Sequence, residues 1–291
     1  MRNTYLKCYS FIYLAFLVSI TRLYAYEGNH EEISDVYLCI GQSNMAGRDL
    51  MNDSLRALSL DNVYLMNNNG DFEKATLPLN RYSTIRKDIS MQHLGPAWSF
   101  AQSMAEYTGH KVGLIVNARG GSAIQEWEKG TLYYNEAVRR SMAVAKAGKL
   151  KAILWHQGES NCLGEYKISP QEYKQRFICM IRQLRHDLGC DSIPVIIGQL
   201  GRWEWADSKV VNDFNAMLVS IAEELPNCSR VLSEGLAPAY PGTSDPHFGT
   251  AAQLTMGIRY AKALIVLKGD VVSVWKSCIK MCTDCLLACR L

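Results

Sequence analysis

The stretch Asp35 to Gly47, DVYLCIGQSNMAG, begins as an apolar run and then changes to a polar turn with one serine between two amide side chains. Val36 to Ile40 is apolar at every position, which is typical of a parallel strand buried on both faces. Ser43 then lies just beyond the carboxyl end of that strand, at the edge where open α/β sheets bind ligands. An ordinary turn, in which Ser43 or Asn44 caps the next helix, is the alternative that this segment alone leaves open.

Strand and helix patterns alternate along the rest of the chain. The predicted helices span 95–107, 134–147, 170–188, 209–225 and 250–267, and the further predicted strands span 112–116, 152–155, 194–197 and 230–232. Such alternation is typical of a parallel sheet with right-handed crossovers and helices on both faces. We therefore expect one three-layer α/β/α domain at 33–267 with a five-stranded parallel sheet.

The composition excludes several classes of protein. The chain has 291 residues, of which 48% are hydrophobic and 20% charged, which is ample for one globular domain with a real core. The formal net charge is only +3, without a dense run of Lys and Arg. Such a charge does not indicate a basic surface that would bind nucleic acid or an anionic membrane, so we expect neither as a partner.

The N-terminus has the layout of a secretory signal peptide. Arg2 and Lys7 precede an apolar stretch from Cys8 to Ile20, and Ala25 offers a small residue at a cleavage position. A membrane anchor is the alternative, but the apolar stretch falls short of the ~20 residues that span a bilayer. We expect residues 1–25 to be removed, leaving a secreted or periplasmic protein with no stable membrane insertion.

The ten cysteines do not define a disulfide framework. Four of them can pair in an exporting compartment without the sequence saying how: Cys162, Cys179, Cys190 and Cys228. Four more form one helical stripe in an appendix of unknown role at 268–291: Cys278, Cys282, Cys285 and Cys289. On a helix this stripe extends over ~16 Å, too far for four thiolates to bind one zinc ion. We expect neither a metal nor a cofactor.

Polar, glycine-rich loops follow the predicted strands, and parallel strands place such loops on one rim. This rim would carry Ser43, His247 and the carboxylate of Asp245. A serine hydroxyl becomes a nucleophile when an imidazole takes its proton and a carboxylate holds the imidazole tautomer. His156 is on the same rim, but Asp245 stands two residues before His247, which makes His247 the preferred base. The rim therefore favours acyl transfer through a serine.

The same rim offers groups for an oxyanion and for a sugar. Gly120 and Gly121 can bring backbone N–H groups close to a developing oxyanion, and Gln157 can add a side-chain amide; a simple tight turn is the alternative for the two glycines. Three tryptophans on or near the rim could stack on sugar rings or serve as packing anchors: Trp127, Trp203 and Trp205. Met45 stands where a Gly-x-Ser-x-Gly elbow needs glycine, which disfavours an ordinary α/β-hydrolase.

With these residues in place, the chain resembles the SGNH hydrolases, and among them the group of sialic-acid-specific acetylesterases and carbohydrate esterase family 6. The strings that carry the resemblance are Gly41-Gln42-Ser43-Asn44-Met45, Asn117 through Ser122, Trp155-His156-Gln157-Gly158-Glu159-Ser160, and Asp245 with His247. The resemblance implies a flavodoxin-like sheet, Ser43 as nucleophile and His247 as base. It also implies three oxyanion donors, which are the Ser43 N–H, the Gly121 N–H and the Gln157 amide.

One position departs from the pattern of that family, which usually places its aspartate three residues before the histidine. Ser244 occupies that place here, and Asp245 stands only two residues before His247. Asp245, Glu159 or a backbone carbonyl therefore remain alternatives for the group that orients the imidazole.

Taken together, the residues and the resemblance predict a serine esterase that removes O-acetyl groups from a carbohydrate. The substrate would be an acetylated xylan-type glycan or O-acetyl sialic acid, and the sequence does not choose between them. The alternatives are a non-catalytic carbohydrate-binding protein on the same fold and an SGNH hydrolase of the lipase or thioesterase type.

Overall fold

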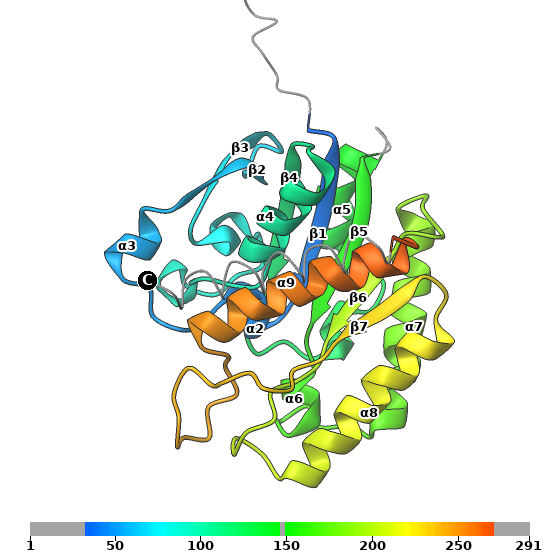
Figure 1. Cartoon of the computed structure of the whole chain (residues 1–291). Coiled ribbons are helices and arrows are strands. Elements are labelled where there is room, and N and C mark those ends of the chain that lie inside the picture. Colours follow the sequence, from blue (N-terminus) through cyan, green and yellow to red (C-terminus); the bar gives the residue numbers. More distant parts are fainter. Residues whose placement is uncertain (1–32, 146–148, 271–291) are drawn as a thin grey trace, which may run out of the picture. The chain divides into compact units, whose positions relative to one another are not determined.

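Figure 1 shows the computed structural model of the chain, which describes residues 33–145 and 149–270. The strands are β1 (Asp35–Gly41), β2 (Ser59–Met66), β3 (Phe72–Thr76), β4 (Val112–Ala118), β5 (Leu150–His156), β6 (Val195–Gly198) and β7 (Cys228–Val231). The longer helices are α4 (Ala97–Thr108), α5 (Leu132–Ala145), α7 (Pro170–Asp187), α8 (Ser208–Glu224) and α9 (Thr250–Leu267). The short helical elements are α2 (Ser43–Ala46), α3 (Asp53–Arg56), η1 (Leu79–Tyr82), η2 (Ile89–Met91), η3 (Ile124–Trp127) and α6 (Glu159–Cys162).

The strands form one sheet in the order β3-β2-β4-β1-β5-β6-β7. All neighbours are parallel except β2 and β3, which pair antiparallel. The α/β class is therefore confirmed, but the expected count of five strands and the expectation of an entirely parallel sheet are wrong.

The two strands that the sequence analysis missed form a hairpin at the edge of the sheet. In β2 only some positions are buried, and the segment carries the exposed Asp61, so it lacks the unbroken apolar run of β1. The available signal was the turn between the strands, where the Asn67 side chain accepts bonds from the backbone N–H groups of Asn69 (2.9 Å) and Asp71 (3.1 Å). Asn-rich turns with glycine between apolar runs are a hairpin signature.

The apolar run that predicted β1 is buried on both faces of the sheet. Val36, Leu38 and Ile40 pack into the core that also contains side chains of α5, α7 and α8. Tyr37 and Cys39 point to the opposite face, into the core built with α4 and α9. Successive side chains of a strand alternate between faces, so only an uninterrupted apolar run fills both cores. Figure 1 shows α9 and α4 on one face of the sheet, and α7 and α8 beyond the other.

The helix predictions agree with the structure to within a few residues. The helix α9 has the predicted bounds, and α7 begins at Pro170, where the Ser169 hydroxyl caps it by accepting a bond from the Glu172 N–H (3.1 Å). Proline at a first helical position and serine before it are ordinary start signals. Local capping chemistry was therefore sufficient to place the start of α7.

Several expectations fall on residues outside the described part of the chain. The signal peptide at 1–25 and the four-cysteine stripe at 278–289 lie there, so these expectations stay predictions. Within the described residues, all the cysteines that could have paired are free thiols: Cys162, Cys179, Cys190 and Cys228. No helix in the described ranges is both long and apolar enough to cross a membrane.

Candidate active site

Ser43 is the second residue after the carboxyl end of the central strand β1. The strand ends at Gly41, Gln42 forms the turn, and Ser43 is the first residue of α2. The Gln42 N–H donates to the carbonyl oxygen of His156 at the end of β5 (2.8 Å), which ties this turn to the neighbouring strand. Ser43 is 4% exposed and lines a cavity at this edge of the sheet.

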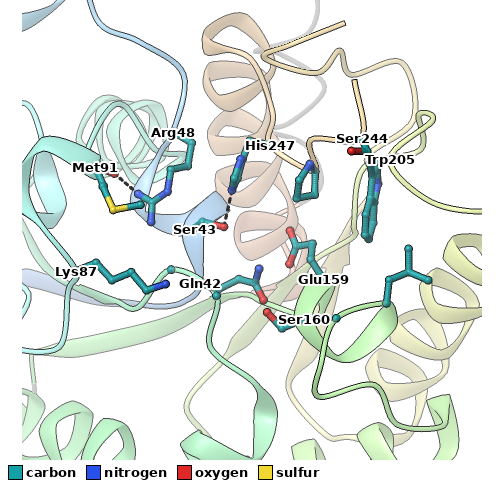
Figure 2. A pocket seen from close by; sticks show the side chains of 15 residues that line it. Gln42, Ser43, Arg48, Lys87, Met91, Glu159, Ser160, Trp205, Ser244 and His247 are labelled. Atoms are coloured by element: carbon teal, nitrogen blue, oxygen red, sulfur yellow. Dashed lines mark hydrogen bonds between the residues drawn. The ribbon is translucent and has the colours of Figure 1, made fainter. Parts of the chain in front are cut away.

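The long loop between β7 and α9 brings His247 and Asp245 to Ser43, more than 200 positions away in the sequence. The His247 Nε2 lies 2.8 Å from the Ser43 Oγ, as Figure 2 shows. The His247 Nδ1 lies 2.9 Å and 3.1 Å from the two carboxylate oxygens of Asp245. The structure therefore brings these three residues together in the order serine, imidazole, carboxylate, despite the short spacing between Asp245 and His247.

Compact loop geometry explains how the short spacing works. The Asp245 Oδ1 also accepts the backbone N–H of His247 (2.8 Å), so the carboxylate folds back over its own loop and contacts both the backbone and the imidazole of the same residue. A side chain that bonds a backbone N–H two residues on is an Asx turn. This turn places the carboxylate beside Nδ1 without the extra residue that the family pattern usually has.

The environment of His247 favours its neutral form. Burial lowers the pKa of His247 below the ordinary value of 6.5, and the nearby Asp245 carboxylate partly offsets this shift. A neutral imidazole whose Nδ1–H donates to Asp245 leaves Nε2 free to accept a proton from the serine. The pair is therefore in the protonation state that a general base requires near neutral pH.

Asn44 links the nucleophile turn to the histidine loop. Its Nδ2 donates to the carbonyl oxygen of Pro246 (3.0 Å), and its Oδ1 accepts the N–H of Phe248 (3.0 Å). These two residues flank His247 on either side. Sequence reasoning treated Asn44 only as a possible helix cap; its place next to Ser43 in the Gly-Gln-Ser-Asn string was the signal for this role.

Glu159 stabilises the loop rather than orienting the imidazole. The Glu159 carboxylate accepts a hydrogen bond from the Asn44 Nδ2, which also donates to Pro246. Glu159 is buried at the start of α6. Burial raises the pKa of Glu159 to about 7. Because Asp245 occupies Nδ1, neither Glu159 nor a backbone carbonyl holds that position in the structure.

His156, the other histidine on the rim, is a core residue. Its Nδ1 lies 3.2 Å from the hydroxyl of Tyr260, and burial lowers the pKa of His156 to about 3. An imidazole that cannot take up a proton near neutral pH is a poor general base. The preference for His247 over His156 therefore agrees with the structure.

The cavity has a volume of about 630 Å³, which is within the range of small-molecule sites. Figure 2 shows the side chains around it, with Ser43 and His247 near the middle. Its lining residues are Gln42, Ser43, Arg48, Lys87, Met91, Gly120, Gly121, Glu159, Ser160, Leu163, Gly164, Trp205, Ser244, Pro246 and His247.

Two of the three expected oxyanion donors border this cavity. Gly121 has φ of +76°, a left-handed conformation that favours glycine, and this turns the chain directly beyond β4. Among the described residues, the backbone N–H groups of Ser43 and Gly121 donate to no protein acceptor. Both are therefore available to a ligand.

Gln157, the third expected donor, is buried, and its amide contacts other protein groups. Its amide nitrogen donates to the carbonyl oxygen of Ser122 (2.9 Å) and to the Asn161 Oδ1 (2.9 Å), and it lies 3.2 Å from the Gln42 Oε1. An amide has only two N–H donors, and these neighbours occupy them. Gln42 lines the cavity instead, and Figure 2 shows its amide nitrogen turned toward the side where Ser43 lies.

The three tryptophans have different positions, and only Trp205 lines the cavity. Trp127 is 1% exposed, donates from Nε1 to the Ser122 Oγ (3.0 Å) and packs against Trp155 in the core. The Trp203 Nε1 donates to the carbonyl oxygen of Asp245 (2.8 Å) and supports the histidine loop. Trp127 is therefore a packing anchor, whereas stacking on a sugar stays a prediction for Trp203 and Trp205.

Comparison with known proteins agrees with this geometry. Residues 33–266 match the family model described as carbohydrate esterase, sialic acid-specific acetylesterase. A probable carbohydrate esterase of Arabidopsis thaliana is 29% identical over 250 residues, which cover 80% of this chain and 90% of the relative. The X-ray structure of that plant protein has a TM-score of 0.68 at 26% identity, over 81% of this chain and 99% of the other.

Two further solved structures share the fold at lower identity. A carbohydrate acetylesterase from Xanthomonas citri has a TM-score of 0.59 at 18% identity and covers 80% of this chain and 56% of its own. NanS has a TM-score of 0.58 at 18% identity, over 84% of this chain and 99% of the other. The expected SGNH hydrolase fold is thus confirmed, and the chain belongs to the carbohydrate esterase, sialic acid-specific acetylesterase family.

Proposed function

We propose that this protein removes O-acetyl groups from a carbohydrate through an acetyl-enzyme on Ser43. The observation that carries the proposal is the contact of 2.8 Å between the Ser43 Oγ and the His247 Nε2, beside a cavity of small-molecule size. Membership of a carbohydrate esterase family supports the class of substrate.

In the first half of the reaction, Ser43 attacks the carbonyl carbon of the acetyl ester. The His247 Nε2 takes the proton of the hydroxyl as the new C–O bond forms, and Asp245 stabilises the imidazolium through Nδ1. The negative charge on the carbonyl oxygen is stabilised by the N–H groups of Ser43 and Gly121. Their open donors and the Gln42 amide at the cavity wall support a three-donor oxyanion site in which Gln42 replaces Gln157.

Collapse of this intermediate breaks the bond between the acetyl carbon and the sugar oxygen. The imidazolium returns its proton to that oxygen, and the deacetylated sugar leaves. In the second half, water adds to the acetyl carbon and His247 takes its proton, after which the Ser43 oxygen departs with that proton and acetate is released. The sequence consumes one water per ester and returns the enzyme to its starting state.

The experiment that tests the proposal compares the mature protein with Ser43→Ala. We expect the unmodified protein to release acetate from 4-nitrophenyl acetate and from an acetylated sugar, and the variant to lose about 10³-fold or more in kcat. Circular dichroism shows whether the variant is folded. A folded Ser43→Ala protein that keeps most of its activity excludes the serine mechanism, and an inactive unmodified protein favours the binding-only alternative.

We also propose that the protein acts outside the cytoplasm, which the N-terminal pattern of Arg2, Lys7 and the apolar stretch after them supports. N-terminal sequencing of the protein recovered from its native source tests this proposal. A chain that begins near Ala25 supports export, and one that retains residues 1–25 in the cytoplasm contradicts it.

A further inference from the structure

The first turn of α9 is bonded to the segment that carries the nucleophile. Thr250, the first residue of α9, donates to the Asp49 Oδ2 from its backbone N–H (2.6 Å) and from its hydroxyl (2.7 Å). One turn further on, the Gln253 Nε2 donates to the carbonyl oxygen of Asn44 (3.1 Å). Residues three apart lie on the same face of a helix. This face of α9 is therefore held at two points by the segment 43–49.

The start of α9 is capped from a distant part of the chain. Its N-cap residue is Gly249, which has no side chain that could accept a bond from the first turn. The helices α7 and α8 are instead capped by the residues directly before them, Ser169 and Asp207. The first N–H groups of a helix have no partner within it, and a side-chain oxygen close to them stabilises that end. Asp49 supplies this oxygen to α9 from 201 positions away in the sequence.

The stretch between the start of α9 and the imidazole passes this position on to His247. Only two residues separate His247 from Thr250. The carbonyl oxygen of His247 accepts the N–H of Ala239 (2.8 Å), and the N–H of Gly249 donates to the carbonyl oxygen of Ala237 (3.1 Å). A backbone this short, with bonds along it, moves together with the helix that it enters. A misplacement of about 1 Å in a reacting group can lower a rate by about 10²-fold.

The chain between Ser43 and Asp49 is closely packed as well. The Gly47 N–H closes α2 by donating to the carbonyl oxygen of Ser43 (2.8 Å). Gly47 has φ of +83°, a left-handed conformation that favours glycine, and a Cβ on it would lie 2.3 Å from the carbonyl oxygen of Leu94. Asp49 is therefore connected to Ser43 through a short segment with little freedom to move.

We propose that Asp49 is a positioning residue of the esterase, which holds the start of α9 and through it keeps the His247 imidazole at the Ser43 hydroxyl. This inference rests on the proposed function. Asp49 is not one of the described residues that line the cavity, so it acts through Thr250 and not on the substrate. A cap that serves only the fold contributes to the free energy of unfolding, whereas a positioning residue also lowers the barrier of the chemical steps.

The test compares the loss of two helix caps, only one of which belongs to the helix that follows His247. In Asp49→Ala the N–H and the hydroxyl of Thr250 lose their acceptor. The control is Ser169→Ala, which removes the cap of α7, a helix of 18 residues like α9. The readouts are the midpoint of urea unfolding, kcat and KM for 4-nitrophenyl acetate, and the rate of inactivation by phenylmethylsulfonyl fluoride.

This inhibitor reports the geometry of the pair without a sugar. The Ser43 Oγ forms a bond to its sulfur and fluoride leaves, while the proton of the hydroxyl passes to the His247 Nε2. The rate of inactivation therefore depends on the contact of 2.8 Å between these two atoms.

We expect both cap variants to unfold at a lower urea concentration than the unmodified protein. Asp49→Ala should also lower kcat and kcat/KM together by about 10- to 100-fold and slow the inactivation by a similar factor, because the imidazole is displaced from Ser43. Ser169→Ala should keep kcat and the inactivation rate within about twofold of the unmodified protein. Asp49→Asn retains an oxygen acceptor for Thr250 and should restore kcat to within about threefold.

Three results would overturn the proposal. The first is a folded Asp49→Ala protein whose kcat and inactivation rate stay within about threefold of the unmodified values. The second is an equal loss in Ser169→Ala, which would assign the effect to stability alone. The third is an Asp49→Asn protein as slow as Asp49→Ala. An unmodified protein that hydrolyses no acetyl ester contradicts the proposed function instead, and the inactivation rates then still decide the role of Asp49.

Thr250→Val keeps the test decisive if Asp49→Ala does not fold. It removes only the hydroxyl that donates to Asp49 and leaves a side chain of the same shape and the backbone bond in place. We expect kcat to fall by about threefold or more at unchanged KM. A folded Thr250→Val protein with the kcat of the unmodified enzyme contradicts the proposal.

Discussion

Replacing Asp245 by asparagine isolates the group that orients His247. The carboxylate accepts the backbone N–H of His247 through Oδ1 (2.8 Å), and both of its oxygens lie near the imidazole Nδ1, Oδ1 at 2.9 Å and Oδ2 at 3.1 Å. In Asp245→Asn the amide oxygen can keep the backbone contact. The amide nitrogen then faces Nδ1 at the position of Oδ2. Two donors cannot face each other, and only the amide oxygen at the Oδ1 position (2.9 Å) still favours a proton on Nδ1, so a larger share of the imidazole carries its proton on Nε2. An imidazole in that tautomer cannot accept the proton of Ser43.

The size of the effect follows from the exposure of Asp245. In a fully buried triad the same change lowers kcat by ~10⁴-fold. The Asp245 side chain is 30% exposed, so water can accept from Nδ1–H and keep a fraction of the imidazole in the productive tautomer. We therefore expect kcat to fall by about 10²- to 10³-fold, or about 3–4 kcal/mol of transition-state stabilisation. His247→Ala should cost at least as much.

The assay is hydrolysis of 4-nitrophenyl acetate across a pH series. Since the Asp245 carboxylate raises the pKa of His247 against the lowering effect of burial, its removal should lower that pKa further. The acid limb of kcat/KM should therefore move to lower pH in Asp245→Asn while the plateau falls. A folded Asp245→Asn enzyme with kcat within tenfold of the unmodified protein and an unchanged acid limb would refute this reasoning, and would leave the serine esterase itself intact.

Further predictions concern pH, stability and substrate size. In the unmodified enzyme the acid limb of kcat/KM should have its midpoint below 6.5, because burial lowers the pKa of His247; a midpoint above 7 in a pH–rate profile contradicts this. The raised pKa of Glu159, about 7 against 4.5 for an ordinary glutamate, means that its contribution to stability is present below pH 4.5 and is lost as the pH rises through about 7. Glu159→Gln keeps an acceptor for Asn44 but has no charge to bury. Its free energy of unfolding, measured by urea denaturation, should therefore rise by up to about 3 kcal/mol relative to that of the unmodified protein as the pH increases from 4.5 to 8. A difference in unfolding free energy that does not change with pH would show that burial does not destabilise the ionised carboxylate. Trp203→Phe removes the hydrogen bond to the carbonyl oxygen of Asp245, so it should lower kcat by roughly tenfold and the free energy of unfolding by about 1 kcal/mol. An unchanged kcat would mean that the histidine loop keeps its position without that bond. Acetyl esters should exceed octanoyl esters in kcat/KM, because the groups around the serine are short polar loops, and a preference for octanoyl esters would favour the lipase alternative.

The layout of the fold was readable in the sequence because its signals are local. The unbroken apolar run of β1 and the capping residues of α7 each act within a few positions of the element that they define. Parallel strands then oblige the loops after them to share one rim, so Ser43 and His247 could be assigned to one site without knowing any distance. The sequence analysis did not predict the edge hairpin of β2 and β3, because its strands are short and only partly apolar. The turn between them was its one clear signal.

Only the tertiary structure decided which of several chemically equivalent side chains face the cavity. Gln42 and Gln157 are both amides on the rim, and their roles are set by a contact between residues 115 positions apart. The same holds for the tryptophans, because an indole that lines a cavity and one that fills a core have the same sequence signature. Arg48 and Lys87 likewise reach the wall of the cavity from separate segments, beside Gly120 and Gly121. Local sequence determines elements and their order, whereas the direction of a side chain within a rim depends on hydrogen-bond partners that only folding brings together.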